Sequence, residues 1–154
     1  MENYMTKKKG KILSTNTCIS LECRSYRTLS EYDRAQGYKG VIKCDRSLPT
    51  TWYRFTGLAG NMMPSSCVAR YYCGTHAPGW LVGGHPTVAQ GIVSRKVCFH
   101  WTSGCCQWSR YIRVRNCGAF YVYRLSPTPA CNLRYCGNRG GVSAGRVTHI
   151  LFDS

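Results

Sequence analysis

The clearest alternation of hydrophobic and polar residues lies in the second half of the chain. Residues 112–116 alternate strictly, which would place Ile112 and Val114 on the inner face of a strand. Residues 117–119 (Cys-Gly-Ala) can turn the chain, and the apolar segment 120–125 can return as a second strand. This pattern predicts a β-hairpin whose outer face carries three arginines, Arg113, Arg115 and Arg124.

Other segments give shorter or weaker signals. Residues 91–101 are the longest strand candidate, and residues 52–56 are predicted as an aromatic strand bounded by Pro49 and Gly57. Residues 71–73 could form a short strand. Leu29 and Tyr32 lie three positions apart, which favours one or two helical turns within residues 26–34. Residues 74–91 contain five glycines and two prolines and are predicted to be mostly irregular loop.

These patterns predict a mostly β fold with small α content: a disulfide-rich single module with long loops. Residues 1–22 are polar and basic and are expected to form a disordered leader. The module itself is expected at 23–136, where the regular pattern and most cysteines lie. Residues 137–154 are glycine-rich and polar and are expected to form a loose C-terminal tail.

The cysteines favour an oxidised protein. The chain has 11 cysteines, and all but Cys18 lie between Cys23 and Cys136. Structural zinc sites favour Cys-x2-Cys pairs, which this chain lacks, so the spacing favours disulfides. An odd number leaves one thiol over, and Cys18 in the leader is the expected spare. The adjacent Cys105 and Cys106 should bond to different places, because a bond between neighbours is strained, and a turn at residues 102–104 could fold Cys98 back toward either of them.

The charge points to anionic partners. Lys and Arg number 21 against six acids, giving a formal net charge of +15. Such an excess favours a polyanion partner such as nucleic acid, an acidic glycan or a membrane surface. The arginines of the predicted hairpin are the candidate basic patch, and a solvated basic face that merely aids solubility is the alternative.

The N-terminal sequence conflicts with export. No apolar run approaches the ~20 residues that a membrane span needs, and Lys7–Lys11 is followed only by Ile12-Leu13, which is too short for the core of a signal peptide. We therefore suppose that the natural N-terminus, with its signal, lies outside this sequence. The competing hypothesis is an intracellular basic cysteine-rich protein that binds nucleic acid or zinc.

Several longer motifs resemble one family, and together they span about Cys23 to Cys136. They are Cys23-Arg24-Ser25-Tyr26-Arg27-Thr28-Leu29, Cys44-Asp45, Trp52-Tyr53-Arg54-Phe55-x-Gly57-x-x-Gly60, Ala77-Pro78-Gly79-Trp80-Leu81, His85-Pro86-Thr87, Gly91-Ile92-Val93-Ser94-Arg95-Lys96-x-Cys98-x-His100-Trp101 and Tyr121-Val122-Tyr123. This region resembles the cysteine-rich module of uromodulin, of the related pancreatic zymogen-granule glycoprotein and of the liver zona-pellucida-type protein.

The resemblance implies a secreted, non-enzymatic module without a cofactor, usually one of several in a surface or matrix glycoprotein. It implies that the module contacts an extracellular protein or glycan. It also implies five disulfides, which are Cys23–Cys117, Cys44–Cys131, Cys67–Cys105, Cys73–Cys136 and Cys98–Cys106, with Cys18 left free.

One family property is not expected here. In uromodulin and its pancreatic relative the module carries N-glycans that act as bait for bacterial lectins. This chain has no Asn-x-Ser/Thr sequon, and Asn16-Thr17-Cys18 is at best a weak acceptor. The glycan-decoy activity is therefore not carried over.

Single residues add little to this hypothesis. His76, His85 and His100 are metal ligands in principle, but bridged cysteines cannot join them as thiolates, and His100 is expected to be a packed or hydrogen-bonded strand histidine. A nucleophilic thiol is not expected, because only Cys18 could be free and it has no patterned neighbour. The aromatic residues are expected mainly in the core, and Trp80, placed on a predicted loop, is the candidate for ligand contact.

Overall fold

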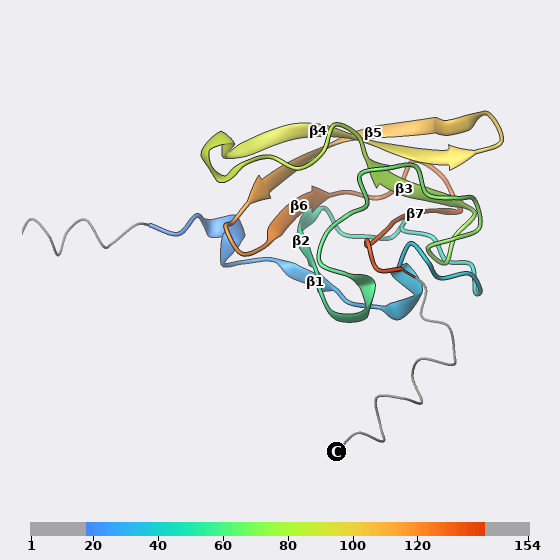
Figure 1. Cartoon of the computed structure of the whole chain (residues 1–154), viewed down its shortest axis with the longest axis horizontal. Coiled ribbons are helices and arrows are strands. Elements are labelled where there is room, and N and C mark those ends of the chain that lie inside the picture. Colours follow the sequence, from blue (N-terminus) through green and yellow to red (C-terminus); the bar gives the residue numbers. More distant parts are fainter. Residues whose placement is uncertain (1–17, 141–154) are drawn as a thin grey trace, which may run out of the picture.

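The computed structural model describes residues 18–140, which form one curled sheet with loops around it (Figure 1). The seven strands are β1 (Arg27–Leu29), β2 (Thr51–Phe55), β3 (Ala77–Leu81), β4 (Ile92–Trp101), β5 (Gly104–Asn116), β6 (Tyr121–Leu125) and β7 (Leu133–Tyr135). The helical content of the described residues is four single 3-10 turns, which are η2 (Leu21–Cys23), η3 (Tyr32–Arg34), η4 (Gly57–Ala59) and η5 (Val88–Gln90). The predicted mostly β fold is confirmed.

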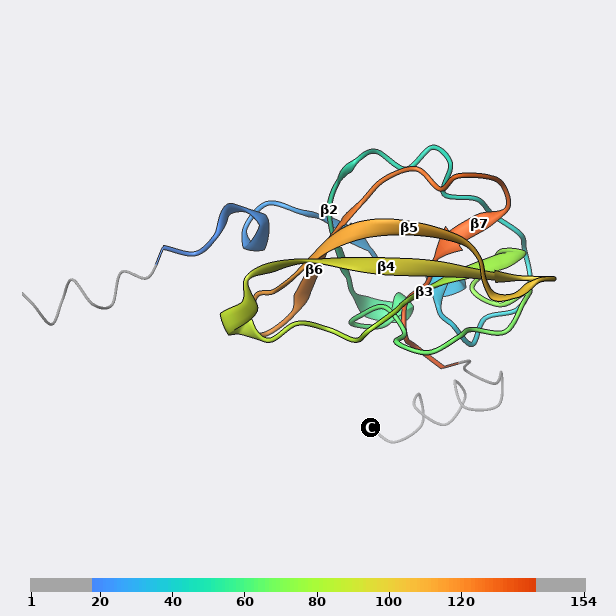
Figure 2. The same ribbon diagram turned by 90° about the horizontal axis from the view of Figure 1, so that it is seen from above.

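The strand order is β1-β2-β6-β5-β4-β3-β7. The central pairs are antiparallel, whereas β1 with β2 and β3 with β7 are parallel. The β4–β5 hairpin is the longest element, and Figure 2 shows it running across the front of the molecule. None of the helical segments in residues 18–140 is long and apolar enough to cross a membrane.

Alternation along the central strands builds the core. Ile112 and Val114 of β5 are 4% and 0% exposed, as their pattern predicted. They meet Tyr123 and Leu125 of β6 and Phe55 of β2 on the concave face of the sheet. The edges of the sheet also approach each other, since Ala35, just after η3, forms a parallel bridge with Gly137, just after β7. The curled sheet therefore encloses one core.

The predicted hairpins are present. Thr102 and Ser103 form the turn between β4 and β5, where Trp101 pairs with Gly104. The side chain of Gln107 accepts the Ser103 N–H at 3.0 Å and so holds this turn. The turn before β6 lies where it was predicted, and β5 is longer than its alternating part because its first half pairs with β4.

Two local predictions are wrong, and the helical segment predicted within residues 26–34 is only partly right. Residues 27–29 form strand β1, which pairs with β2, and η3 supplies only one helical turn. Residues 71–73 form no strand; Tyr71 and Cys73 have φ of 68° and 62°, which breaks extended structure. Residues 77–81, predicted as loop, form strand β3 between β4 and β7.

Gly79 explains why β3 escapes the usual pattern. A Cβ at this position would lie 2.8 Å from the Phe99 ring and 3.0 Å from the Arg134 carbonyl oxygen, so the neighbouring strands require a residue without a side chain. The glycine that suggested a loop is therefore a packing requirement of a buried strand.

The ends of the predicted module also differ from expectation. Residues 1–17 of the predicted leader and residues 141–154 of the predicted tail lie outside the described part of the chain. Within it, Leu21–Cys23 form η2, and Gly137 is not loose: its N–H donates to the Arg34 carbonyl at 2.9 Å and its own carbonyl accepts the Gln36 N–H at 2.8 Å.

Candidate binding surface and the bonds that hold it

Five disulfides connect the loops to the sheet: Cys23–Cys117, Cys44–Cys131, Cys67–Cys105, Cys73–Cys136 and Cys98–Cys106. They are the same pairs that the family resemblance implies. Four of them join residues between 38 and 94 positions apart, so they fix segments that no local turn could hold. Cys18 is exposed and is the one unpaired cysteine of residues 18–140.

The adjacent cysteines at the start of β5 bond in different directions. Cys106 closes the short loop to Cys98 on the neighbouring strand, and Cys105 reaches Cys67 in the long loop before β3. Trp80 lies across this region, and its indole N–H donates to the Cys105 carbonyl at 2.8 Å. The tip of the β4–β5 hairpin is thus held by two covalent bonds and by β3.

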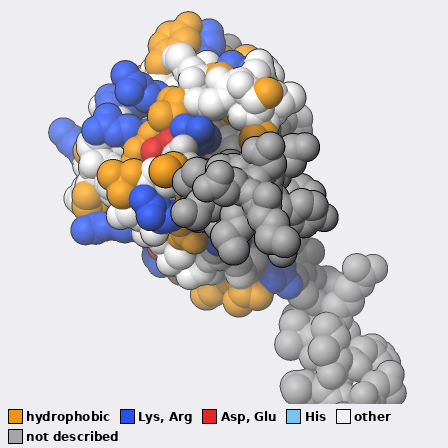
Figure 3. Space-filling model, turned by 90° about the vertical axis from the view of Figure 1, so that its left-hand side faces the viewer, with side chains coloured by type: hydrophobic (Ala, Val, Ile, Leu, Met, Phe, Trp, Pro, Cys, Tyr) orange, Lys and Arg blue, Asp and Glu red, His pale blue; other side chains and the backbone are white. Residues whose placement is uncertain are grey.

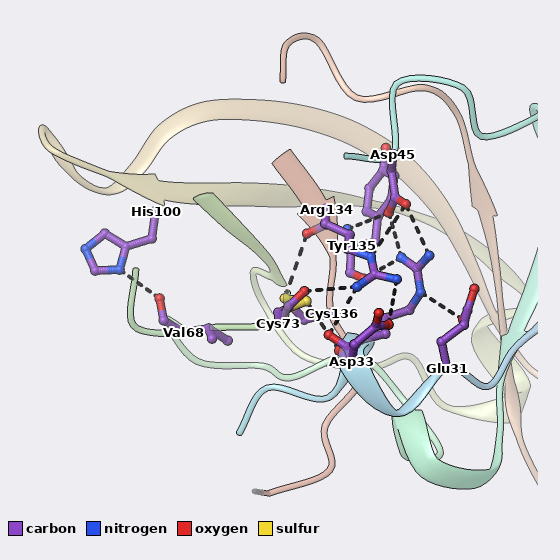
Figure 4. Close-up of a disulfide and its surroundings, with 10 residues drawn as sticks. Glu31, Asp33, Asp45, Val68, Cys73, His100, Arg134, Tyr135 and Cys136 are labelled. Atoms are coloured by element: carbon purple, nitrogen blue, oxygen red, sulfur yellow. Dashed lines mark hydrogen bonds and ion pairs between the residues drawn. A yellow bond between two sulfur atoms is a disulfide. The ribbon is translucent and has the colours of Figure 1, made fainter. Parts of the chain in front are cut away.

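A cluster of charged side chains lies beside the disulfide Cys73–Cys136 (Figure 4). Arg34 donates from both terminal nitrogens to the Asp45 carboxylate, at 2.7 and 3.1 Å. Arg134 donates to the Asp33 carboxylate at 3.0 Å. All four side chains are at most 6% exposed, so each charge depends on its partner for the solvation that water would otherwise supply.

The backbone completes the cluster. Asp45 also accepts the Tyr135 N–H at 2.9 Å, and Arg34 donates to the Tyr135 carbonyl at 3.0 Å. Arg134 donates to the Asp33 carbonyl at 3.1 Å. These contacts tie η3 and the loop after it to β7, which would otherwise pair only with β3.

The partners shift the pKa values of the cluster. Burial alone would raise the pKa of Asp33, but the hydrogen bond from Lys43 and the charge of Arg134 hold it below its usual value. Burial opposes the charge of Arg34 as well, and the Asp45 carboxylate more than offsets it, so the pKa of Arg34 is raised. Asp33 and Arg34 are therefore both charged at neutral pH.

Sequence reasoning missed this cluster. In the sequence, Asp33-Arg34 and Asp45-Arg46 look like ordinary surface charges. Composition is the one signal that could have pointed to these residues. The chain has only six acids, and two of them are Asp33, which lies in η3, and Asp45, which follows Cys44.

The predicted basic patch is only partly brought together. Arg113 and Arg124 are directly opposite each other on β5 and β6, and both are exposed. Arg115 lies on the same face, but its guanidinium donates to the Glu22 carboxylate at 2.6 Å, so its charge is paired. Figure 3 shows the end of the molecule near the N-terminal segment, where Lys and Arg side chains gather around a small acidic area.

The aromatic residues divide between core and surface. Tyr53 and Phe55 are 2% and 1% exposed, whereas the four tryptophans are each half-buried. Trp80 lies on β3 and not on a loop, and its N–H is already bonded to Cys105, so only its ring is left for a ligand. Its role in ligand contact stays a prediction.

The histidines have separate surroundings. His100 bonds through Nδ1 to the Val68 carbonyl oxygen at 2.7 Å, and His76 stacks on Trp101 with ring centroids 5.5 Å apart. The ligand atoms of His100, Cys67 and Cys105 lie within 4.8 Å of one another, as in a metal site. The two sulfurs are bonded to each other, however, so neither is a thiolate ligand in this structure.

A shallow cavity of about 260 Å³ lies beside the turn that precedes β6. Arg54 forms one side, with its guanidinium carbon 3.9 Å from the centre of the Phe120 ring and its Nη1 donating to the Tyr26 hydroxyl at 3.0 Å. Asn61 and Asn116 add polar atoms to its wall. The Tyr26 ring also lies against Phe120, with centroids 5.5 Å apart, so this contact and the bond from Arg54 hold the segment around Tyr26 against the hairpin.

Comparisons with known proteins found sequence similarity over most of the chain. The model of the uromodulin-like domain family matches residues 53–137. Mouse uromodulin is 47% identical over 121 residues, which are 78% of this chain and 19% of that protein. The pancreatic secretory granule membrane major glycoprotein GP2 is 47% identical over 116 residues in dog and 42% in human, covering 74% of this chain and 23% and 21% of those proteins. The chain thus spans about a fifth of the length of these curated relatives.

Proposed function

The chain belongs to the uromodulin-like domain family, and from this premise we propose that it is a secreted, non-catalytic module that contacts an extracellular protein or glycan. In this proposal the disulfides supply rigidity, and the surface of the sheet supplies the contacts. Because the matched relatives are much longer than this chain, the proposal concerns the module and not the activity of a whole glycoprotein.

The observation that carries the proposal is the pairing of cysteines. Ten of the 11 cysteines bond within the described part of the chain, and four of the bonds close long loops. Such bonds persist in an oxidising compartment and are rare where thiols are kept reduced. The pairing also uses up the thiolates that a zinc site or a cysteine nucleophile would need.

The buried charges support a scaffold role. The most buried charged groups among the described residues are Arg34, Asp45, Arg134 and Asp33. Their hydrogen-bonding partners are mainly each other and backbone atoms. A catalytic pair would instead face a cleft open to substrate. Their contacts connect η3 to β7, which supports a structural role.

Counting free thiols tests this proposal. The full chain, fused to a signal peptide and secreted from animal cells, is alkylated under non-reducing denaturing conditions and weighed intact by mass spectrometry. We expect one alkylated cysteine, Cys18, and peptide mapping should recover the five pairs. Ten or eleven alkylated cysteines, or a stoichiometric zinc ion in the native protein, would overturn the proposal in favour of an intracellular protein.

A further inference from the structure

The described carboxylates are all paired with cations. Glu22 bonds to Arg115, Glu31 to Arg34, Asp33 to Lys43 and Arg134, and Asp45 to Arg34. Among residues 18–140, then, no carboxylate remains to neutralise the other Lys and Arg side chains. Soluble proteins usually mix charges of both signs on their surface. The surface of this part of the chain is instead strongly cationic.

Two of these cations face each other across neighbouring strands. Arg113 of β5 is the direct partner of Arg124 of β6, and neither makes an ion pair with a described carboxylate. Like charges placed directly opposite on one face of an antiparallel pair destabilise it. Their juxtaposition therefore costs the fold free energy that a bound anion would recover.

The register extends this pair into a line across four strands. Trp52 of β2 is the partner of Arg124, and Ser94 of β4 is the partner of Arg113. Since directly paired residues project from the same face, these side chains form one row, which we call the arginine row: Trp52, Arg124, Arg113 and Ser94. Neighbouring strands are ~4.8 Å apart, so the two guanidinium groups can engage one anionic group or two closely spaced ones.

The residues beside the arginine row suit the same ligand. Lys96 lies two residues from Ser94 and thus on the same face, and its partner Tyr111 is 71% exposed. Arg115, two residues beyond Arg113, is held by Glu22, which limits the free charge on that side. Lys96, Arg113 and Arg124 therefore form a short strip of cations on one face of the sheet.

We propose that the arginine row binds a sulfated polysaccharide. An arginine fork matches the oxygens of a sulfate group as it does those of phosphate, and the half-buried ring of Trp52 at the end of the row offers a surface for a sugar ring. Nucleic acid has similar charge, but the proposed extracellular location, on which this inference rests, favours a sulfated glycan. The row thus assigns a partner class to the module.

Binding of heparin to the full chain tests the inference. Arg113→Gln with Arg124→Gln removes the two charges of the row, and Arg46→Gln with Arg70→Gln removes two exposed charges elsewhere. Both double variants have the same net charge and retain Lys7–Lys11. The disulfide map and the circular dichroism spectrum of each variant establish that it is folded.

We expect the Arg113/Arg124 variant to bind a heparin dodecasaccharide at least tenfold more weakly than the parent. The slope of log affinity against log salt should fall by about two, because two ionic contacts are lost. The affinity of the Arg46/Arg70 variant for the dodecasaccharide should be within about twofold of that of the parent. Chemically desulfated heparin should bind neither the parent nor this variant.

Four results would overturn the inference. Equal losses of heparin affinity in the two double variants would mean diffuse attraction, and an Arg113/Arg124 variant that binds heparin as tightly as the parent would mean that the row is not the site. The other two are desulfated heparin that binds as tightly as heparin, and double-stranded DNA that binds more tightly than heparin of matched charge. Any of these results can occur while the thiol count still shows five disulfides. The proposed binding by the arginine row can therefore be wrong while the proposed secreted module is right.

Discussion

Arg34 and Asp45 form a two-bond ion pair inside the protein, with nitrogen–oxygen distances of 2.7 and 3.1 Å and side chains that are 4% and 6% exposed. The pair joins η3 to the loop that carries Cys44, and through the Tyr135 N–H it also reaches β7. In a chain with so few acids, this use of a carboxylate shows that negative charge serves to hold segments of the fold together.

Replacing Asp45 by asparagine should be strongly destabilising. The change leaves the buried guanidinium of Arg34 with a neutral partner, and breaking a buried ion pair in this way costs about 3–5 kcal/mol. Urea unfolding at pH 7 with the disulfides intact measures the free energy of unfolding. Glu31→Gln is the matched control, because Glu31 also pairs with Arg34 but is 47% exposed, and it should cost less than ~1 kcal/mol. Equal costs for the two variants would contradict this account.

Gly137→Ala should also destabilise the fold. A Cβ at Gly137 would overlap the carbonyl oxygen of Ala59, and its own backbone groups are bonded to η3 and to the segment just after it, so the chain has little freedom to move away. We expect a loss of about 1–3 kcal/mol. Gly140→Ala is the control, since a Cβ there meets nothing within 4 Å. Thermal unfolding of both variants decides; a Gly137→Ala protein as stable as the parent would show that this segment is not packed as described.

The part of the fold that the sequence predicted depends on local signals. Ile112 and Val114 alternate with arginines, and this was enough to predict the hairpin of β5 and β6 with the correct inner face. The turn between β4 and β5 was likewise predicted from its residues. These elements are set by period and by turn chemistry, both of which can be read within a short window.

The rest depends on contacts between distant segments. Gly79 is predicted as loop because the reason for a glycine there cannot be read locally. Phe99 and Arg134, which lie far along the chain, leave no room for a side chain at this position. Gly137 was assigned to the tail for the same reason. The sequence placed Arg115 in the same basic patch as Arg113, because no pattern in the sequence shows that Glu22 pairs with Arg115 and not with Arg113.

Removing the Cys44–Cys131 bond should be costly. Its ends are 87 residues apart, and in the chain-entropy model a loop of that size contributes about 4–5 kcal/mol to stability. Cys44→Ala with Cys131→Ala should therefore lower the free energy of unfolding by that amount. Cys18→Ala is the control, because Cys18 is exposed and unpaired, and it should change stability by less than ~0.5 kcal/mol. A double variant that loses under ~2 kcal/mol would mean that other contacts already hold these loops.

Stability should fall with mild acid through His85. Its Nε2 lies 2.6 Å from the Tyr123 hydroxyl, which accepts the Met63 N–H at 3.0 Å, and its ring centroid is 4.3 Å from that of Tyr121. Burial, together with the charge of Arg95, lowers the pKa of His85 from 6.5 to about 4. The folded protein thus resists protonation that the unfolded chain accepts, so the contribution of His85 to the free energy of unfolding should drop as pH falls from 6.5 to about 4 and level off below that.

The variant His85→Gln isolates this contribution, because glutamine retains a hydrogen-bonding amide but does not titrate. The stability of the parent relative to His85→Gln should decrease by about 1–2 kcal/mol between pH 7.5 and pH 4, less than the full shift would give because the ring is partly exposed. Urea unfolding at several pH values measures the difference, in which the titration of the carboxylates cancels. A difference that stays constant across this range would show that His85 is as free to take up a proton in the folded protein as in the unfolded chain.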